Sequence, residues 1–285
     1  MIMLPRWLKK PSSSIEQTQK VRRAIASHNL NTVCRSAQCP NLGECFSAGT
    51  ATFLILGSTC TRTCSFCAID KGTPLPVDAE EPNRIALAIQ ELGIKHAVVT
   101  SVTRDDLVDG GATQFAATIT AIKTLNPGVT VEVLIPDFRG SESAIQTVLA
   151  ASPDIFNHNL ETVERLYPTV RPQADYHQSM KILAYAKECM PKLITKSGIM
   201  VGLGERKNEI FSLMNELISV KCNILTIGQY LQPSKKHHNV EKYYTPAEFD
   251  ELKLTAVEKG FLGVESSPFT RSSYHAEQVI RKVSK

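Results

Sequence analysis

The sequence predicts an α/β fold of six consecutive strand–helix units, arranged as a partial (βα)6 TIM-like barrel. Short apolar runs of strand type alternate with helical stretches from Ala51 to Lys259, and such alternation favours a parallel sheet. Each unit takes about 30–35 residues, which suits the units of a βα barrel. Six units are fewer than the eight of a closed barrel, so we expect a partial barrel, with an open doubly wound sheet as the alternative.

The predicted strands are apolar runs too short for helices, as expected of strands that are buried on both faces. They span residues 51–57, 96–101, 129–136, 154–159, 194–202 and 223–230. The helices between and after them are predicted from apolar residues at helical spacing. They span residues 81–92, 114–125, 142–151, 178–189, 209–220 and 246–259.

Two shorter pieces flank the barrel. Residues 14–28 predict a helix capped by Ser14, whereas residues 31–48 predict a loop, because Asn, Cys, Pro and Gly interrupt any period. We therefore expect an N-terminal extension over residues 1–50, a barrel over 51–260 and a C-terminal tail over 261–285, rather than independent domains.

The composition is that of an ordinary globular protein. Apolar residues make up 42% and charged residues 21% of the chain, which is enough apolar surface to offset chain entropy. The net charge of +4 is too small to indicate a nucleic-acid partner. No apolar run approaches the roughly 18–20 residues that span a bilayer, and the charged N-terminus does not fit a signal peptide. We expect a cytoplasmic protein without a membrane partner.

Eight cysteines carry the strongest functional signal, and six of them lie between Cys34 and Cys67. In a chain of this length without a leader, this density indicates metal or redox chemistry. Cys60, Cys64 and Cys67 follow the first strand with the spacing C-x3-C-x2-C. Three thiolates can hold three irons of a 4Fe–4S cluster and leave the fourth iron open to a ligand. Reduced thiols, or a zinc site completed from elsewhere, are the alternatives.

A second trio lies just upstream, where Cys34, Cys39 and Cys45 have the spacing C-x4-C-x5-C. This spacing matches no common zinc pattern and favours a second cluster that again lacks one protein ligand. A disulfide within the trio is the alternative, and it would leave an odd thiol. Cys189 and Cys222 are expected to be small buried apolar residues without chemistry.

Polar residues follow each predicted strand, and functional residues gather at this edge of a parallel sheet. Strand-end loops are often polar for ordinary reasons, but here the first trio lies among them. The set includes Thr103, Arg104, Asp105, Asp137, Arg139, Asn159, Glu161, Glu205, Gln229, Gln232 and Ser234.

With Phe66 before its last cysteine, the first trio resembles the C-x3-C-x-aromatic-C motif of the radical S-adenosylmethionine (SAM) superfamily. The resemblance implies that the methionyl amino and carboxylate groups of SAM bind the open iron. One electron then cleaves SAM to methionine and a 5′-deoxyadenosyl radical, which abstracts hydrogen from an unactivated carbon. The fold that it implies is the partial barrel predicted above.

The two trios in this order closely resemble one branch of the superfamily, the lipoyl synthases. Further similar stretches extend the resemblance from about Pro5 to Ala276, and they span residues 98–115, 156–172, 195–205, 226–249 and 271–276. In that branch an auxiliary cluster is held by the N-terminal trio and a serine of an RSSY motif. Carried over here, this serine is Ser273, with Ser272 as the nearest competitor. An oxygen ligand is less usual on iron than a thiolate, so this corner is expected to be the easiest to lose.

The resemblance also suggests which residues contact SAM. Asn159, Glu161 and Arg171 are expected at its sugar and carboxylate, with Thr103 and Asp105 near its amino group. Carboxylates accept hydrogen bonds from hydroxyl and ammonium groups, and Arg pairs with a carboxylate.

The activity that the resemblance implies is sulfur transfer, with the auxiliary 4Fe–4S cluster consumed as the sulfur source. Two sulfur atoms enter carbons 6 and 8 of an octanoyl group on a lysine of a lipoyl carrier domain. The implied partners are acyltransferase subunits of 2-oxoacid dehydrogenases, the glycine cleavage H protein, and a reductant of flavodoxin or ferredoxin type. Lys235–His238 is a basic cluster that we expect on a solvated loop, with a docking patch for an acidic carrier domain as the alternative.

Two other functions are alternatives to this one. A tRNA methylthiotransferase also pairs a cysteine trio with the radical SAM motif, but it should carry widely spaced upstream cysteines and a basic RNA-binding domain. An electron carrier with two clusters should use four cysteines for each cluster. The sequence shows neither pattern.

Overall fold

The computed structural model describes residues 5–8, 15–274 and 276. Its main sheet has eight strands in the order β1-β2-β5-β6-β7-β8-β9-β10. All neighbours are parallel except β1, which pairs antiparallel with β2. The strands are β1 (Asn31–Thr32), β2 (Thr52–Ile55), β5 (His96–Ser101), β6 (Thr130–Leu134), β7 (Ile155–Asn157), β8 (Ile194–Val201), β9 (Ile224–Gln229) and β10 (Gly263–Ser267). A separate small pair consists of β3 (Thr59–Cys60) and β4 (Asp70–Lys71).

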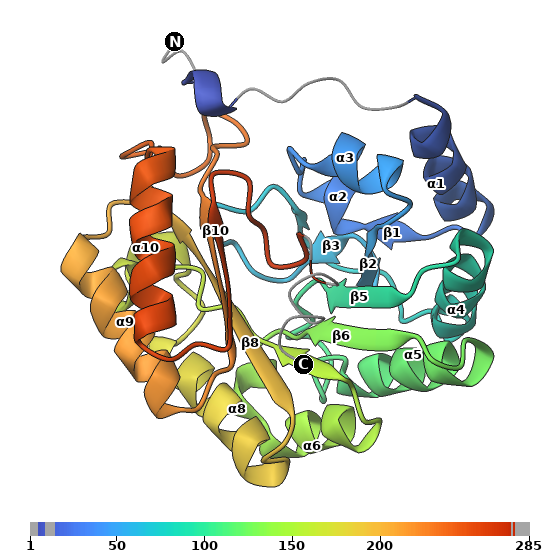
Figure 1. Ribbon diagram of the computed structural model, residues 1–285. Coiled ribbons are helices and arrows are strands. Elements are labelled where there is room, and N and C mark those ends of the chain that lie inside the picture. The colour runs from blue at the N-terminus through green and yellow to red at the C-terminus, as the bar shows by residue number, and fades with distance from the viewer. Residues whose placement is uncertain (1–4, 9–14, 275, 277–285) are drawn as a thin grey trace.

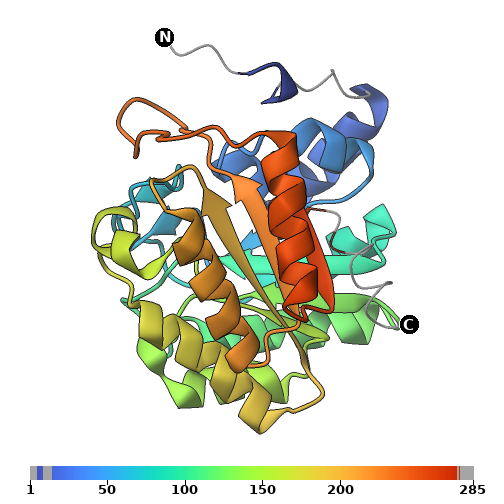
Figure 2. The ribbon, with the colours of Figure 1, turned by 60° about the vertical axis from the view of Figure 1, so that its left-hand side comes forward.

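Six long helices follow the six strands from β2 to β9, and they lie on the outside of the curved sheet (Figure 1, Figure 2). Within the described residues, β1 and β10 do not pair with each other, so the sheet stays open. The partial barrel of six strand–helix units is thus confirmed. The helices are α4 (Glu81–Leu92), α5 (Ala112–Leu125), α6 (Glu142–Ala150), α8 (Tyr176–Cys189), α9 (Lys207–Ser219) and α10 (Pro246–Glu258).

The sheet contains one parallel strand more than the six expected. β10 lies beyond residue 260, in the segment expected to be the tail, and it pairs along its whole length with β9. Its sequence, GVESS, has one large apolar residue, Val264, so no apolar run marks it as a strand. Pairing with β9, and packing against α10, decide its conformation.

The prediction of a loop over residues 31–48 is wrong. This segment forms β1, α2 (Val33–Ser36) and α3 (Leu42–Ser47), after α1 (Ile15–Ser27). Thr32 caps α2, because its hydroxyl oxygen accepts a hydrogen bond from the Arg35 amide at 3.4 Å. Helices of four and six residues are too short to show a period, so only tertiary contacts such as the burial of Phe46 reveal them. The remaining short helices are η1 (Arg6–Leu8), η2 (Phe138–Gly140), η3 (Glu164–Leu166) and α7 (Tyr167–Val170).

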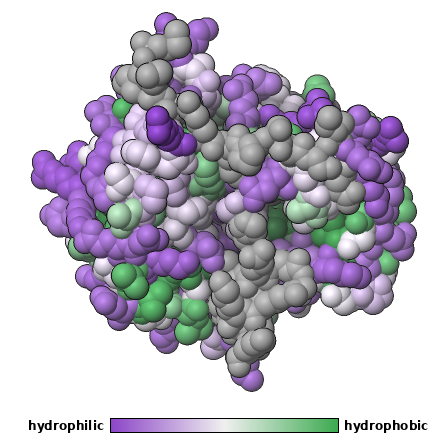
Figure 3. Space-filling view, turned by 45° about the horizontal axis from the view of Figure 1, so that its top comes forward, coloured by the Kyte–Doolittle hydropathy of each residue, from purple (hydrophilic) through white to green (hydrophobic). Residues whose placement is uncertain are grey.

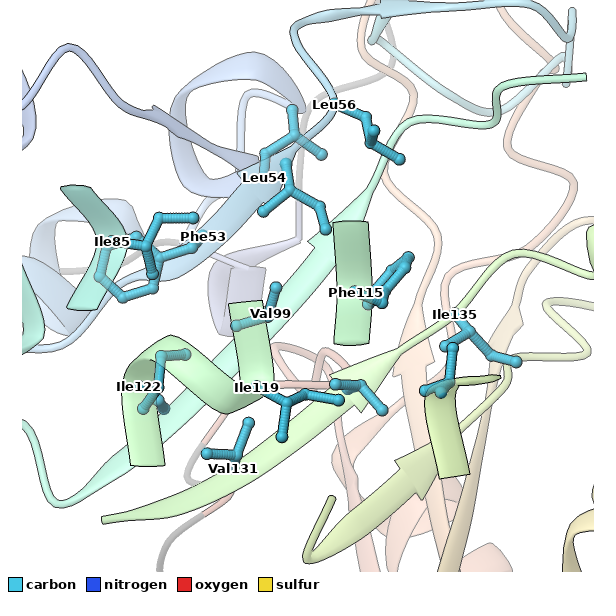
Figure 4. Packing of buried hydrophobic residues seen from close by; sticks show 14 of the residues in the cluster. Phe53, Leu54, Leu56, Ile85, Val99, Phe115, Ile119, Ile122, Val131 and Ile135 are labelled. Carbon is cyan, nitrogen blue, oxygen red and sulfur yellow. The ribbon is translucent and has the colours of Figure 1, made fainter. Parts of the chain in front are cut away.

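The hydrophobic core lies between the sheet and its outer helices. Alternate residues of each strand face the helices and are fully or almost fully buried, which follows from the two-residue period of a strand. Figure 4 shows this packing for the strands β2, β5 and β6 against α4 and α5. The residues concerned include Phe53, Val99, Val131, Ile85, Ile119 and Ile122.

Charged residues occupy the inner side of the sheet near the beginning of its strands. The buried carboxylate of Glu132 accepts hydrogen bonds from Lys196 Nζ at 2.8 Å and Asn157 Nδ2 at 3.1 Å. His96 Nε2 lies 3.4 Å from its other oxygen. Burial opposes ionisation of Glu132, but Lys196 and His96 outweigh burial and lower its pKa to about 2. This network joins β5, β6, β7 and β8 on the inner side of the sheet.

The surface is mostly hydrophilic in the view of Figure 3, where hydrophobic residues form small separate patches. Across the described part of the chain, no helix combines the length and the apolar character needed to cross a membrane.

Candidate active site

The Cys60–Cys67 loop begins at the end of β3, shortly beyond β2, and is anchored on several sides. The Thr61 amide donates to the Thr103 carbonyl at 3.1 Å, and the Ser65 amide donates to the Val170 carbonyl at 3.0 Å. The thiols of Cys60, Cys64 and Cys67 are half-buried. Burial raises the pKa of Cys64 and raises that of Cys67 to about 12, and the other thiols of the loop add to both shifts. The three sulfur atoms therefore lie close enough to act on one another electrostatically.

Arg62 lies between the first two cysteines of this loop and binds two aspartates. Its guanidinium donates to both carboxylate oxygens of Asp105 at 2.7 and 2.9 Å, and to both of Asp137 at 2.6 and 2.7 Å. The Arg62 side chain is 6% exposed, and that of Asp137 is 1% exposed. Arg62 thus ties the cysteine loop to the ends of β5 and β6 with bidentate, charge-assisted hydrogen bonds.

The basic cluster Lys235–His238 also contacts the cysteine loop. His237 Nε2 lies 3.2 Å from the Cys67 carbonyl oxygen, and the His238 amide donates to the Ser65 carbonyl at 2.9 Å. Lys235 and Lys236 are exposed, but the two histidines are half-buried. The expectation of a fully solvated loop is therefore wrong for the histidines, because the loop after β9 folds back over the cysteines.

Asn159, Glu161 and Arg171 come together after β7, as their expected common role requires. Asn159 Nδ2 donates to Glu161 Oε1 at 2.9 Å, and Arg171 Nη1 donates to the Asn159 carbonyl at 3.1 Å. Glu161 has a φ of +65°, which is uncommon for a residue that is not glycine. Its backbone is held there by a bridge to Ile199 in β8. Burial raises the pKa of Glu161, although the charge of Arg171 opposes this shift.

Several buried polar atoms near this site have no hydrogen-bond partner within the described residues. They include Ser101 Oγ, Asn159 Oδ1, Arg171 Nε and His158 Nε2, which belong to the ends of β5 and β7 and the segment after β7. A buried polar atom without a hydrogen-bond partner lowers the stability of the fold by about 1–3 kcal/mol. A ligand with several polar groups would supply the missing partners at this site. Burial, and then the charge of Arg171, lower the pKa of His158 to about 4, so its imidazole is neutral at pH 7.

The other residues expected to contact SAM lie in different surroundings. Phe66 is half-buried in the cysteine loop and packs against a hydrophobic cluster that includes Leu160, Leu203 and Tyr230. Thr103 contributes its carbonyl, which accepts from the backbone and the hydroxyl of Thr61. Both carboxylate oxygens of Asp105 accept from Arg62, and Oδ1 also lies 3.2 Å from Arg139 Nε. Asp105 is thus held by arginines.

The N-terminal trio is carried by the short helices of the extension. Cys34 lies in α2, Cys45 in α3, and Cys39 between them. Burial raises the pKa of the Cys34 thiol to about 11, while contacts with the backbone and hydroxyl of Thr52 act in the other direction. Asn41, also between the two helices, donates to the Phe269 carbonyl at 2.7 Å. This hydrogen bond joins the extension to the segment after β10.

The Arg271–Tyr274 motif lies against the N-terminal trio. Ser273 Oγ accepts a hydrogen bond from Thr52 Oγ1 at 2.7 Å, and Thr52 also contacts the Cys34 thiol. Tyr274 donates to Glu44, beside Cys45, at 2.7 Å. Ser272 points elsewhere, since its Oγ accepts from Asn159 Nδ2 at 2.6 Å. Of the two serines, Ser273 is therefore the one that faces the trio.

A cavity of about 200 Å³ opens beside Ser273. Its wall includes Cys45, Thr52, Val98, Ser273 and Tyr274. Across residues 5–8, 15–274 and 276, no three Cys, His, Asp or Glu side chains are grouped as they are around a single metal ion. A cubane cluster is held differently, because each thiolate binds a different iron atom. Five of the six thiols are half-buried, Cys34 is buried, and the two trios lie on two anchored segments, which fits such clusters.

Sequence reasoning missed the structural roles of Arg62, Thr52 and Asn41. A charged residue enclosed by a cysteine motif is a signal for Arg62, whereas nothing in the sequence marks Thr52 at the start of an apolar strand. Cys222 is buried as expected, but Cys189 is exposed. Its expected burial is wrong because it is the last residue of α8, where the end of the helix leaves it open to solvent.

The fold and the cysteine loop define a radical SAM enzyme, and residues 54–217 match the model of the radical SAM superfamily. The lipoyl synthase of Caldanaerobacter subterraneus subsp. tengcongensis is 54% identical over 96% of this chain and 95% of its own length. That of Rubrobacter xylanophilus is 53% identical over 96% of this chain and 85% of its own. The chain belongs to the lipoyl synthase family. It is therefore a radical SAM sulfurtransferase with SAM and 4Fe–4S clusters as cofactors.

A solved structure shares the fold. HydG, a maturase of the [FeFe]-hydrogenase, superposes with a TM-score of 0.61 over 81% of this chain and 54% of its own, at 16% identity. At that identity the likeness concerns the fold alone.

Proposed function

We propose that this enzyme inserts sulfur at carbons 6 and 8 of an octanoyl group on a lysine of a lipoyl carrier domain. Cys60, Cys64 and Cys67 hold the cluster that binds SAM, and Cys34, Cys39, Cys45 and Ser273 hold the auxiliary cluster, which supplies the sulfur. The observation that carries this proposal is the hydrogen bond between Ser273 and Thr52, the residue that also contacts Cys34. It supports a fourth ligand from the far end of the chain.

The bound cofactors supply the chemistry of C–H activation and sulfur donation, and the protein positions them. Arg62 fixes the loop of the first trio against β5 and β6. Asn159, Glu161 and Arg171 bind the polar groups of SAM, which satisfies the orphaned atoms Asn159 Oδ1 and Arg171 Nε. Phe66 shields the loop, and Thr103 shapes it through its carbonyl.

Asp105 has a narrower role in this proposal. Because both of its carboxylate oxygens accept from Arg62, it acts on the cysteine loop through Arg62, beside the amino group of SAM.

Ser273 is suited to be a cluster ligand that dissociates easily. Oxygen is a harder ligand than sulfur, so the Ser273 oxygen would hold the iron atom at its corner of the auxiliary cluster less strongly than the three thiolates would. The adjacent cavity, lined by Val98 and Thr52 as well as Cys45, leaves space beside that corner for a substrate chain.

The proposed partners are octanoylated carrier domains, namely those of 2-oxoacid dehydrogenase acyltransferases and the glycine cleavage H protein, and a reductant of flavodoxin or ferredoxin type. The exposed Lys235 and Lys236 lie in the loop that covers the cysteines, where positive charge raises the rate of association with acidic partners. The enzyme works in the cytoplasm, without nucleic acid or membrane.

The decisive experiment is turnover of an octanoylated carrier domain by anaerobically purified enzyme with SAM and a reductant. Mass spectrometry should show a gain of two sulfur atoms in the reduced dithiol product, and a further loss of two hydrogen atoms when air oxidises the dithiol to the cyclic disulfide. The enzyme should contain about eight irons and eight sulfides per chain before turnover. An unmodified carrier together with thiomethylated tRNA would instead support the methylthiotransferase.

A further inference from the structure

The four residues of the Arg271–Tyr274 motif contact both candidate sites. On one side, Ser272 Oγ accepts from Asn159 at 2.6 Å. On the other side, Ser273 bonds to Thr52 at 2.7 Å and Tyr274 bonds to Glu44 at 2.7 Å. Arg271 lies between them, within electrostatic reach of Glu161 and of Cys39. The tail is thus a short physical link between the residues proposed to bind SAM and those proposed to bind the auxiliary cluster.

Two glycines make room for this link inside the barrel. A Cβ atom at Gly198 in β8 would lie 2.6 Å from Thr226 Oγ1 in β9, 2.9 Å from Asn159 Oδ1 and 3.1 Å from Ser272 Oγ. A Cβ atom at Gly228 in β9 would overlap the Thr270 carbonyl. Neither glycine has a positive φ, so close packing rather than a turn requires the missing side chain. At Gly228 the packing neighbour is the tail itself, and at Gly198 it is Thr226 and Asn159 together with Ser272.

Asn159 is the residue that both sides share. Its two amide hydrogens are used by Glu161 and Ser272, while its Oδ1 is buried and has no partner in the described residues. A ligand hydroxyl that donates to Asn159 Oδ1 would fix the amide plane. Because the amide is rigid and planar, fixing Oδ1 also fixes the direction in which Nδ2 points at Ser272.

We infer that Ser272 is a positioning residue that couples the two sites, so that bound SAM holds the tail, and with it Ser273, in place. This inference rests on the function proposed above. Coupling between two sites is reciprocal, so loss of the Ser272 hydroxyl weakens SAM binding as well as the hold on the tail. Coupling between two sites typically changes the affinity for a ligand by about 5–150-fold. Because a single hydrogen bond links the two sites here, we expect a change in SAM affinity near the lower end of that range.

The test measures how fast trypsin cleaves after Arg271, a bond in the half-buried tail that a protease should reach faster when the tail leaves the barrel. Cluster-loaded enzyme is digested briefly without reductant, so that SAM stays intact, and mass spectrometry follows the fragment that starts at Ser272. In the unmodified enzyme we expect SAM to slow this cleavage about fivefold. In Ser272→Ala we expect faster cleavage that SAM no longer slows, and weaker SAM binding by equilibrium dialysis.

Ser266→Ala is the matched control. Ser266 also lies near the end of the chain and its hydroxyl donates a buried hydrogen bond, to the Phe249 carbonyl at 2.8 Å, but it faces α10 instead of Asn159. This variant should keep the protection by SAM. The coupling is overturned if SAM protects Ser272→Ala as well as the unmodified enzyme, or protects neither.

Iron content separates this inference from the proposed function. About eight irons per chain together with no effect of SAM on the tail would overturn only the coupling. About four irons in the unmodified enzyme would contradict the auxiliary cluster and, with it, this role of the tail.

Discussion

Arg62 and Asp137 form a buried, bidentate ion pair directly beneath the cysteine loop, with two oxygen–nitrogen distances of 2.6 and 2.7 Å. Arg62 is part of the cysteine motif, whereas Asp137 follows β6, 75 residues later. Such a pair contributes little net stability, but removal of one partner leaves an uncompensated buried charge. The pair therefore fixes where the cysteine loop lies relative to the strand ends.

Arg62→Gln should loosen the first cluster. Since Asp105 and Asp137 lose their common partner, we expect the iron content to fall toward about four per chain. The rate of 5′-deoxyadenosine formation should fall at least about tenfold, because reactions are sensitive to the loss of exact positioning. Arg104→Gln is the control, because Arg104 is a buried arginine of the neighbouring loop that binds Asp106 at 2.8 Å and no cysteine. Equal loss of iron in both variants would show a general effect on folding.

The two cysteine trios should have separable roles. Cys64→Ala removes a ligand of the first cluster and should abolish cleavage of SAM. Cys39→Ala should spare cleavage of SAM and stop sulfur insertion, because it affects only the auxiliary cluster. Chromatography of 5′-deoxyadenosine and mass spectrometry of the carrier domain measure the two activities. An equal loss of deoxyadenosine in both variants, with circular dichroism unchanged, would contradict this division.

Ser273 should matter for sulfur insertion and not for cleavage of SAM. Ser273→Ala removes the oxygen ligand, so we expect normal cleavage with faster loss of about four irons to a chelator. Ser273→Cys should hold the cluster more tightly, because thiolate is the better ligand for iron, and should insert sulfur poorly. A fully active Ser273→Ala enzyme would leave Ser272 or an external ligand as the alternative.

Glu132→Gln should destabilise the fold without touching either cluster. The variant leaves Lys196 buried without its carboxylate partner. We therefore expect the free energy of unfolding, measured with urea at pH 7, to fall by about 3–5 kcal/mol. The folded pKa of Glu132 is lowered to about 2, so its ionic contribution is present above its usual pKa and is lost as pH falls through about 2. The difference in free energy of unfolding between the unmodified protein and Glu132→Gln should therefore shrink below about pH 4.

The exposed pair Arg165–Glu209 supplies the control for this prediction. Glu209 accepts from Arg165 at 2.7 Å at the surface, where ion pairs contribute little. Glu209→Gln should shift the urea midpoint far less than Glu132→Gln. Equal shifts would contradict the importance of the buried network.

Elements with a strong local pattern could be predicted from the sequence to within one or two residues. β5 is the apolar run HAVVTS, and α4 is bounded by Pro82 in its first turn and by Gly93, with a φ of +67°, after its end. β10 and the helices α2 and α3 could not be predicted, because a five-residue strand with one large apolar side chain and helices of one turn have no usable period. Their conformations depend on the neighbours against which they pack.

The site divides in the same way. The spacing of Cys60, Cys64 and Cys67 is local, because ligands on one short loop need that spacing wherever the loop lies. Ser272 and Ser273 are chemically identical neighbours, so only the path of the tail through the barrel decides which one faces Asn159 and which faces Thr52.

The sequence by itself thus determined the parallel α/β fold and the two cysteine groups, since periodicity and ligand spacing act over a few residues. Only the tertiary structure decided the partners of Arg62 and the meeting of Thr52 with Ser273, which are 221 positions apart. The physical reason is that such a contact depends on the curvature of the whole open sheet and on the space that Gly198 and Gly228 leave inside it, and no local pattern encodes either.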